Sequence, residues 1–295
     1  MSVPPSTPRF ALTGAAGFVA PRHMQAIRDV NGELVAALDP HDAVGVLDRF
    51  NRSTEFFVEP ERFERHLDLL RRIGNGIDWL SVCSPNHLHD VHSRLGLRAG
   101  ANVICEKPLT LSPWNLDALA EEERRTGRHV YTVLQLRLLP ALANLRSRIM
   151  SKAGHHEVEV RYVTPRGPWY QHSWKGDPER SGGLVTNIGI HLFDALLWVF
   201  GRVDKMAITL RTSTAVSGTL HLERAFCRWF LSIDGDEPCR KMTVDGEDVL
   251  FSDGFNELHT RLYEQTLRGL GYTIESARPA VELAHRLRSY PVRGV

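Results

Sequence analysis

The fold is decided by one stretch near the amino terminus, Phe10-Ala11-Leu12-Thr13-Gly14-Ala15-Ala16-Gly17-Phe18-Val19-Ala20. Its first four residues form an apolar run that is typical of a parallel strand covered on both faces. The run leads into a turn that is a degenerate form of the dinucleotide-binding fingerprint. There Gly14 can make the tight turn, and Ala16 or Gly17 must let a pyrophosphate approach the next helix. Such a turn can also be an ordinary connection.

A carboxylate after the second apolar run strengthens the cofactor hypothesis. The run Leu34–Leu38 ends at Asp39, which lies 25 residues after Gly14. An acid near this spacing accepts hydrogen bonds from the adenosine ribose and repels a 2′-phosphate. We therefore predict NAD rather than NADP. Asp39-Pro40 could also cap the next helix, and the two roles are compatible.

The first half of the chain alternates short apolar runs with amphipathic segments. In Pro60–Arg72, for example, Phe63, Leu67 and Leu70 recur at helical spacing. Alternation of this kind predicts a doubly wound parallel sheet that binds ligands at the carboxyl ends of its strands. The predicted strands are Phe10–Thr13, Leu34–Leu38, Glu55–Val58, Trp79–Cys83, Asn102–Cys105 and Val130–Leu134.

The pattern changes in the second half, from about residue 155. Val158, Val160 and Tyr162 alternate with polar residues, as Leu220 and Leu222 do later. A period of two indicates an open, mostly antiparallel sheet with one exposed face. We therefore expect an α/β first domain over residues 1–134 and an α+β domain for substrate binding and oligomerisation over 135–295.

Composition limits the partners and the location. The net charge of +1 gives no electrostatic reason to expect nucleic acid or an acidic membrane surface. The four cysteines form no CxxC pair and are interpreted as reduced thiols. We find neither a signal peptide nor an apolar stretch long enough to span a membrane, so a cytoplasmic protein is expected. The Pro-rich first eight residues are expected to form a disordered tail.

Polar motifs follow the fourth and fifth predicted strands. They are Ser84-Pro85-Asn86-His87-Leu88-His89 and Glu106-Lys107-Pro108. Pro108 ends its strand, which leaves the Lys107 amine at the sheet edge, where burial could adapt it to proton transfer. The alternative is a surface lysine in a turn. We do not expect His87, His89 and His92 to bind a metal, because their spacing does not converge on one ion.

Three polar residues stand out in an apolar segment of the second half. Asn187, His191 and Asp194 are spaced i, i+4 and i+7 in a helix predicted to run from about Arg180 to Phe200. His191 could be a structural histidine capped by Asp194. It could equally be a general base, because imidazole titrates near neutral pH.

A loop over residues 165–177 precedes that helix and combines aromatic with basic side chains. We expect no regular structure in it, and loops of this richness are often functional. Arg166, His172 and Lys175 could pair with anionic groups of a ligand, and Tyr170 and the tryptophans could stack on a ring. The alternative is a surface loop or an oligomer contact.

Taken together, these motifs resemble the Gfo/Idh/MocA oxidoreductases. The resemblance rests on the glycine turn, on the two strand-end motifs and on the segment from Gly182-Gly183 to Asn187-Ile188-Gly189-Ile190-His191-Leu192-Phe193-Asp194. It spans nearly the whole chain, in order, and Glu106-Lys107-Pro108 is its most specific element. It implies an N-terminal Rossmann domain. Two positions depart from the family pattern: Asn187 stands where aspartate is usual, and Ala16 replaces the second glycine.

The stretches Ala11–His23 and Arg166–Asp177 resemble one subgroup, which oxidises the 3-hydroxyl of UDP-N-acetylglucosaminuronic acid for bacterial surface polysaccharides (O-antigen). This resemblance implies a homotetramer, a nucleotide-sugar substrate and 2-oxoglutarate as a candidate oxidant. It implies Lys107 and His191 as catalytic residues. The implied NAD-binding residues are Gly14, Ala16, Gly17, Phe18, Val19, Asp39, Ser84, Asn86, His87, Glu106, Lys107 and Gln135. The implied substrate-binding residues are Lys107, Arg166, Tyr170, His172, Ser173, Trp174, Lys175, Asn187 and His191.

Two other functions remain open on the sequence. One is a related dehydrogenase acting on a non-nucleotide sugar or inositol, against which the aromatic and basic loop argues. The other is a non-catalytic NAD-binding regulatory protein, against which Lys107 and His191 argue.

Overall fold

The computed structural model describes residues 7–151, 153–249 and 257–292, so most of the expected N-terminal tail lies outside the described residues. The chain divides into two compact units. The first contains the described residues up to Thr110, Trp114–Val133 and His259–Ile274. The second contains Leu111–Pro113, Leu134–Leu258 and the described residues from Glu275 onward. The segment His259–Ile274, which the sequence-based division placed in the second domain, thus belongs to the first unit.

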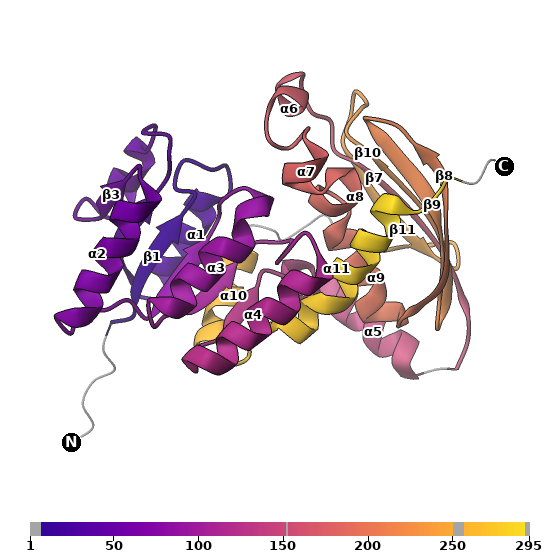
Figure 1. Cartoon of the computed structure of the whole chain (residues 1–295). Coiled ribbons are helices and arrows are strands. Elements are labelled where there is room, and N and C mark those ends of the chain that lie inside the picture. Colours follow the sequence, from indigo (N-terminus) through magenta and orange to yellow (C-terminus); the bar gives the residue numbers. More distant parts are fainter. Residues whose placement is uncertain (1–6, 152, 250–256, 293–295) are drawn as a thin grey trace. The chain divides into compact units, whose positions relative to one another are not determined.

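The first unit is built on a six-stranded sheet in which every neighbouring pair is parallel, in the order β3-β2-β1-β4-β5-β6 (Figure 1). All six strands match predicted runs, which confirms the doubly wound sheet. The strand order reverses between β1 and β4, which is where ligands bind in such sheets. The strands are β1 (Arg9–Thr13), β2 (Glu33–Leu38), β3 (Glu55–Phe57), β4 (Trp79–Val82), β5 (Asn102–Cys105) and β6 (Val130–Thr132).

Helices of the first unit pack amphipathic faces on this sheet. The helix predicted over Pro60–Arg72 forms with those bounds as α2, and it buries Phe63 and Leu67. The last helix of this unit, α10, comes from a distant part of the sequence and buries Leu262 and Tyr263. The helices are α1 (Ala20–Asp29), α2, α3 (His89–Arg98), α4 (Pro113–Thr126) and α10 (Leu258–Leu267), with short 3-10 turns η1 (Gly45–Arg49) and η2 (Asn86–Leu88).

The second unit is built on a six-stranded sheet in the order β12-β11-β7-β10-β9-β8 (Figure 1). Only β7 and β10 pair in parallel among its described strands, so the predicted open, mostly antiparallel sheet is confirmed. Its strands are β7 (His156–Val163), β8 (Val203–Arg211), β9 (Ala215–Leu222), β10 (Ala225–Ser232), β11 (Cys239–Val244) and β12 (Glu247–Val249).

The helical part of the second unit differs in two ways from the prediction. The predicted loop over residues 165–177 contains one short helix, α6, and a second short helix, α7, follows it directly, because Pro168 and Pro178 begin helical turns and Asp177 caps the second one. The predicted long helix is broken into α8 and α9. The helices are η3 (Gln135–Leu138), α5 (Pro140–Ser151), α6 (Trp169–His172), α7 (Pro178–Ser181), α8 (Gly183–Asn187), α9 (Ile190–Phe200) and α11 (Ile274–Ser289).

The break between α8 and α9 separates residues that the prediction placed on one helix face. The segments Pro178–Asn187 and Ile190–Phe200 meet at 44°. A Cβ on Gly189 would lie 2.5 Å from the carbonyl oxygen of Val185, so only glycine fits at this bend. Within the described ranges no single helix is long and apolar enough to cross a membrane, although this bent pair passes by length and composition.

Candidate functional site

The glycine turn after β1 is packed against the end of β4. Gly14 has φ +83°, and a Cβ there would lie 2.5 Å from backbone atoms of Cys83 and Ser84. Any other residue would therefore strain the turn and push the two strand ends apart. Gly17 closes the turn by donating its amide to the carbonyl of Gly14 at 2.9 Å. The turn thus brings the backbone of residues 14–17 close to the ends of β1 and β4.

The residues after this turn fit the phosphates of a dinucleotide. In the described part of the chain, no acceptor takes the amide protons of Phe18 and Val19 at the start of α1. Amides at a helix N-terminus form a ready anion site. The side chain of Phe18 is 86% exposed, so only its backbone fits this role. Ala16 is anchored differently, because its amide donates to Asp39 Oδ2 at 3.0 Å.

Asp39 connects the turn to the end of β2. Its Oδ1 accepts from the amide of His41 at 2.9 Å, and its Oδ2 accepts from Ala16. No helix follows Asp39 directly, so the alternative of a helix cap is not what the structure shows. Each carboxylate oxygen keeps a second lone pair that can accept a ribose hydroxyl. The site therefore fits the NAD hypothesis.

Two histidines form hydrogen bonds with the segment that follows β4. His89 is buried, with Nε2 2.8 Å from the carbonyl oxygen of Ser84 and Nδ1 2.6 Å from that of Pro108. Burial lowers the pKa of His89 although these two carbonyls oppose it. His92 Nδ1 lies 2.8 Å from Ser84 Oγ, and burial lowers its pKa to about 4. His89 thereby connects the ends of β4 and β5.

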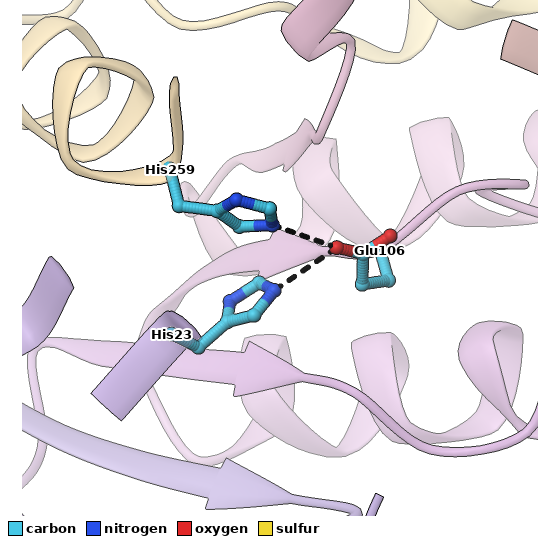
Figure 2. A group of neighbouring side chains, drawn as sticks. All are labelled: His23, Glu106 and His259. Atoms are coloured by element: carbon cyan, nitrogen blue, oxygen red, sulfur yellow. Dashed lines mark hydrogen bonds and ion pairs between the residues drawn. The ribbon is translucent and has the colours of Figure 1, made fainter. Parts of the chain in front are cut away.

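Glu106 lies at the end of β5 between two buried imidazoles, as Figure 2 shows. Its Oε1 is 3.1 Å from His23 Nε2 and 3.2 Å from His259 Nε2, and its Oε2 accepts the amide of Lys107 at 3.1 Å. Burial alone would raise the pKa of Glu106, but the hydrogen bonds from both histidines outweigh it and hold the pKa well below its ordinary value. The carboxylate is therefore ionised and fully hydrogen-bonded on the histidine side.

The network continues from His23 into the sheet. Tyr263 Oη is 2.7 Å from His23 Nδ1 and 2.6 Å from Ser81 Oγ. With the Nε2 proton directed to Glu106, His23 Nδ1 accepts from Tyr263, and Tyr263 in turn accepts from Ser81. Burial raises the pKa of Tyr263 well above its ordinary value, so the phenol stays protonated. One consistent set of protons therefore satisfies the chain from Ser81 to Glu106.

This cluster was missed in the sequence. His23, Glu106 and His259 are the one group of metal-ligand residue types in the described chain whose ligand atoms lie within 4.8 Å of one another. The Nε2–H groups of both histidines donate to the Glu106 carboxylate, and these hydrogen bonds occupy the space in which a metal ion would lie. His23 carries no motif, and His259 lies in a segment whose return to the first unit has no local signal.

Lys107 follows Glu106 directly. Its amide is held by Glu106, its peptide bond to Pro108 is cis, and its side chain is half-buried and engaged in the structure. The predicted cofactor residues Ser84 and Asn86, which follow β4, are buried, and His87 is half-buried. The first unit therefore positions Lys107 through the backbone on both sides of it.

The second unit holds the predicted substrate loop. Tyr170 is buried, while Arg166 and His172 are exposed, and Arg166 Nη1 donates to the carbonyl of its neighbour Pro165. Ser173 Oγ donates to the carbonyl of Tyr170 at 2.9 Å. Lys175 Nζ lies 4.2 Å from the ring centre of Trp174. These contacts give the loop a defined shape and leave Arg166 and His172 at its surface.

Asn187, His191 and Asp194 differ in burial and in the partners that surround them. Asn187 is buried in α8 and its Nδ2 donates to Tyr170 Oη at 2.7 Å, a bond that an aspartate in this position could only accept. His191 lies in the first turn of α9 and is half-buried. Asp194 is buried and paired with Arg137 at 2.6 and 3.0 Å. Asp194 is therefore engaged by Arg137, which the sequence did not indicate, and it does not cap His191.

Gln135 opens the helical part of the second unit, in η3. Its side chain is 7% exposed, and within the described chain its Oε1 has no hydrogen-bond partner. A buried acceptor without a donor is costly, so Gln135 is suited to receive a donor from a ligand.

A doubly wound sheet with this turn, these amides and this carboxylate defines a dinucleotide-binding oxidoreductase with a second, sheet-based domain. Comparison with known families agrees. Residues 8–134 match the oxidoreductase family with an NAD-binding Rossmann fold, and residues 155–233 match the GFO/IDH/MocA C-terminal domain. The chain belongs to the Gfo/Idh/MocA family and carries its NAD-binding domain, as the resemblance implied.

Among solved structures, the chain is similar to the WlbA (WbpB) dehydrogenase of Thermus thermophilus. A structure of that protein with NAD and alpha-ketoglutarate is 50% identical, covers 98% of this chain and 97% of its own, and superposes with a TM-score of 0.95. A second structure of it, with NAD and UDP-GlcNAcA, is 49% identical with the same coverage and TM-score.

Among curated proteins, the chain is 29% identical over 126 residues to the D-glucoside 3-dehydrogenase of Escherichia coli (strain K12). That match covers 42% of this chain and 36% of the relative, so the chain spans about a third of that protein's length. The family assignment therefore rests on the two family models, which match segments of both units.

Proposed function

We propose that the enzyme uses NAD to oxidise the 3-hydroxyl of UDP-N-acetylglucosaminuronic acid to a ketone. The observation that carries this proposal is the similarity over almost the full length to the T. thermophilus dehydrogenase, which binds both NAD and UDP-GlcNAcA. The D-glucoside 3-dehydrogenase among the relatives supports oxidation at the same position.

The first unit is proposed to hold NAD at the carboxyl end of its sheet. The turn from Gly14 to Gly17 and the amides of Phe18 and Val19 would hold the phosphates, and Asp39 the adenosine ribose. NAD supplies the hydride acceptor for the oxidation. The remaining proposed contacts are Ser84, Asn86, His87, Glu106, Lys107 and Gln135. Among these, Gln135 offers an unpaired acceptor, and Glu106 acts through the Lys107 backbone.

His191 and Lys107 are the proposed catalytic residues. Loss of hydride from C3 requires that the hydroxyl proton leave as the ketone forms. His191 would accept this proton, and the Lys107 ammonium would hydrogen-bond the same oxygen and stabilise its developing negative charge. The remaining proposed substrate contacts are Arg166, Tyr170, His172, Ser173, Trp174, Lys175 and Asn187.

The wider setting is part of the same proposal. A nucleotide-sugar oxidation of this kind belongs to bacterial surface polysaccharide synthesis in the cytoplasm. We propose a homotetramer as the working assembly. We also propose 2-oxoglutarate as the oxidant that takes up the two electrons and becomes 2-hydroxyglutarate, because alpha-ketoglutarate is bound in the T. thermophilus structure.

The test is a single-turnover assay of NAD reduction with UDP-GlcNAcA, followed by mass analysis of the sugar product. His191→Ala and Lys107→Ala should each lower the rate about 100- to 10,000-fold, because each removes a group that acts on the proton or the oxygen. His155→Ala and Lys205→Ala, at surface positions, are the matched controls. Near wild-type rates in either active-site variant would remove that residue from the mechanism.

A substrate panel separates this proposal from its rivals. It would contain UDP-GlcNAcA, the same sugar without UDP, glucosides and inositol. Faster turnover of a sugar without UDP would replace the nucleotide sugar with a free polyol as substrate. Binding of NAD with no oxidation of any sugar would indicate a regulatory protein.

A further inference from the structure

A pocket of about 250 Å³ lies in the second unit, and basic side chains from three separate segments reach its wall. Lys175 comes from the loop between α6 and α7, Arg211 from the end of β8, and Arg288 from the last turn of α11. We define these three residues as the cationic pocket. No aspartate or glutamate is among the residues that line it. The fold therefore concentrates positive charge in one hollow.

Two of the three cations form no ion pair with a carboxylate among the described residues. In the described chain neither Arg211 nor Arg288 pairs with a carboxylate. Arg211 Nη2 donates to the carbonyl of Leu287 at 2.7 Å, which holds the guanidinium against α11, and no other described residue accepts from this guanidinium. Both guanidinium groups therefore keep donors for a ligand.

The environment of Arg288 is particularly unfavourable for a cation without a ligand. Its Nη2 lies 3.0 Å from His285 Nδ1, which must accept, so this imidazole is neutral in the contact. Burial lowers the pKa of Arg288, against the attraction of Glu179. Burial and the Arg288 charge together also lower the pKa of His285. An anion in the pocket would add a counter-charge in direct contact with Arg288.

Neutral polar groups are also among the residues that line the cationic pocket, and they can complete an anion site. Tyr170 Oη accepts from Asn187 Nδ2, so the tyrosine keeps its own proton to donate. Burial raises the pKa of Tyr170, which keeps that proton in place. Thr212 and Ser213 add hydroxyl groups beside Arg211. The pocket thus offers charged and neutral donors together.

We propose that the cationic pocket binds the diphosphate of the nucleotide-sugar substrate, with Arg211 and Arg288 as its principal ligands. This assignment rests on the proposed function. A guanidinium group can donate two hydrogen bonds to the oxygens of one phosphate, and three cations from separate segments match a group with two anionic centres better than a single carboxylate. The pocket thereby extends the substrate site beyond the loop over residues 165–177 to β8 and α11.

The experiment measures binding without turnover, by calorimetry with UDP, pyrophosphate, uridine and 2-oxoglutarate. Arg211→Gln and Arg288→Gln should each weaken UDP and pyrophosphate binding about 10- to 100-fold, which is the effect of losing a charge-assisted hydrogen bond. Uridine, which has no phosphate, should bind all variants equally. Arg202→Gln is the matched control, because Arg202 is exposed and outside the pocket. Circular dichroism checks that each variant is folded. Arg288→Lys is a conservative change that keeps the positive charge and provides a second folded variant.

Unchanged UDP affinity in folded Arg211→Gln and Arg288→Gln would overturn the assignment. Loss of 2-oxoglutarate binding with intact UDP binding would also overturn it, because the occupant would then be the dicarboxylate. The experiment distinguishes failure of the pocket assignment from failure of the proposed function. Pyrophosphate binding lost in the arginine variants supports the pocket even if UDP-GlcNAcA is not oxidised. Oxidation with unchanged KM in both variants refutes the pocket alone.

Discussion

In the first unit the carboxylate of Glu106 lies between two imidazoles and a backbone amide, whereas in the second unit Arg211 and Arg288 line a pocket without any carboxylate. The first arrangement is buried, and its charged group is hydrogen-bonded on all sides by neighbouring residues. The second is open to solvent and carries unbalanced charge. The difference teaches that a buried charge with its own hydrogen-bond donors stabilises a scaffold, while a group of charges without ion-pair partners indicates a ligand.

Removing the anion of the first region should have the largest effect on stability. Glu106→Ala leaves His23 and His259 without their common acceptor and frees the amide of Lys107. Each buried donor that is left without an acceptor typically costs about 1–3 kcal/mol in the free energy of unfolding, and this substitution leaves several such donors. Denaturant titration of Glu106→Ala measures this loss. Glu121→Ala on the exposed face of α4 is the control and should change it by about 0.5 kcal/mol or less.

If Glu106→Ala unfolds at nearly the wild-type denaturant concentration, the stabilising role that separates the first region from the second is contradicted. The cluster would then contribute no more than an exposed pair. Its role would have to be sought in cofactor binding instead of in the scaffold.

Acid should weaken the first region through His92. Its pKa in the folded protein is about 4, below the ordinary 6.5, because of burial and then the neighbouring His89 and His87. The unfolded chain therefore binds more protons below 6.5, so this contribution to stability is present above 6.5 and is lost as the pH falls toward 4. Over this whole pH range the free energy of unfolding should fall by about 3 kcal/mol through His92.

The measurement is the free energy of unfolding between neutral pH and about pH 4. His92→Gln keeps a partner for Ser84 Oγ but cannot titrate, so its stability should fall less on acidification than that of the wild type. His155→Gln, at an exposed position, should follow the wild type. Parallel curves for wild type and His92→Gln would contradict the assignment.

The two imidazoles of the cluster are not equivalent, which allows a finer test. His23 is hydrogen-bonded through both ring nitrogens, to Tyr263 and Glu106, whereas His259 Nδ1 is buried without a partner in the described chain. His23→Ala should therefore cost about 1 kcal/mol more than His259→Ala, the typical net contribution of one hydrogen bond. Equal losses in parallel denaturant titrations would show that the Tyr263 bond contributes nothing.

The sequence predicted the parts of the fold that depend on local pattern. Apolar runs predicted all six parallel strands, and the glycine turn predicted where α1 begins, because a strand, a turn and a helix start are encoded by adjacent residues. Lys107 at the end of its strand was likewise predicted from Pro108. Its support by Glu106, His23 and His259 was not.

What the sequence could not show are contacts between distant segments. His259 and Tyr263 reach Glu106 and Ser81 only because α10 returns to the first unit. Arg211 and Arg288 lie 77 residues apart in the sequence, and they line the same pocket only after β8 and α11 have packed together. The bend at Gly189 depends on Leu231 and Phe193 around it, so a continuous helical pattern concealed it.

The smallest effect is expected from neutralising the second region without ligand. Arg211→Gln loses a partly buried hydrogen bond to Leu287, which would lower stability, but it also relieves repulsion from Arg288 and Lys175, which would raise it. Both terms are a few tenths of a kcal/mol at such exposure, so the free energy of unfolding should change by about 0.5 kcal/mol or less. Salt separates them, because it screens repulsion and leaves the hydrogen bond largely intact. Added salt should therefore stabilise the wild type slightly more than Arg211→Gln. A loss of several kcal/mol at every salt concentration would mean that Arg211 belongs to the scaffold, as Glu106 does.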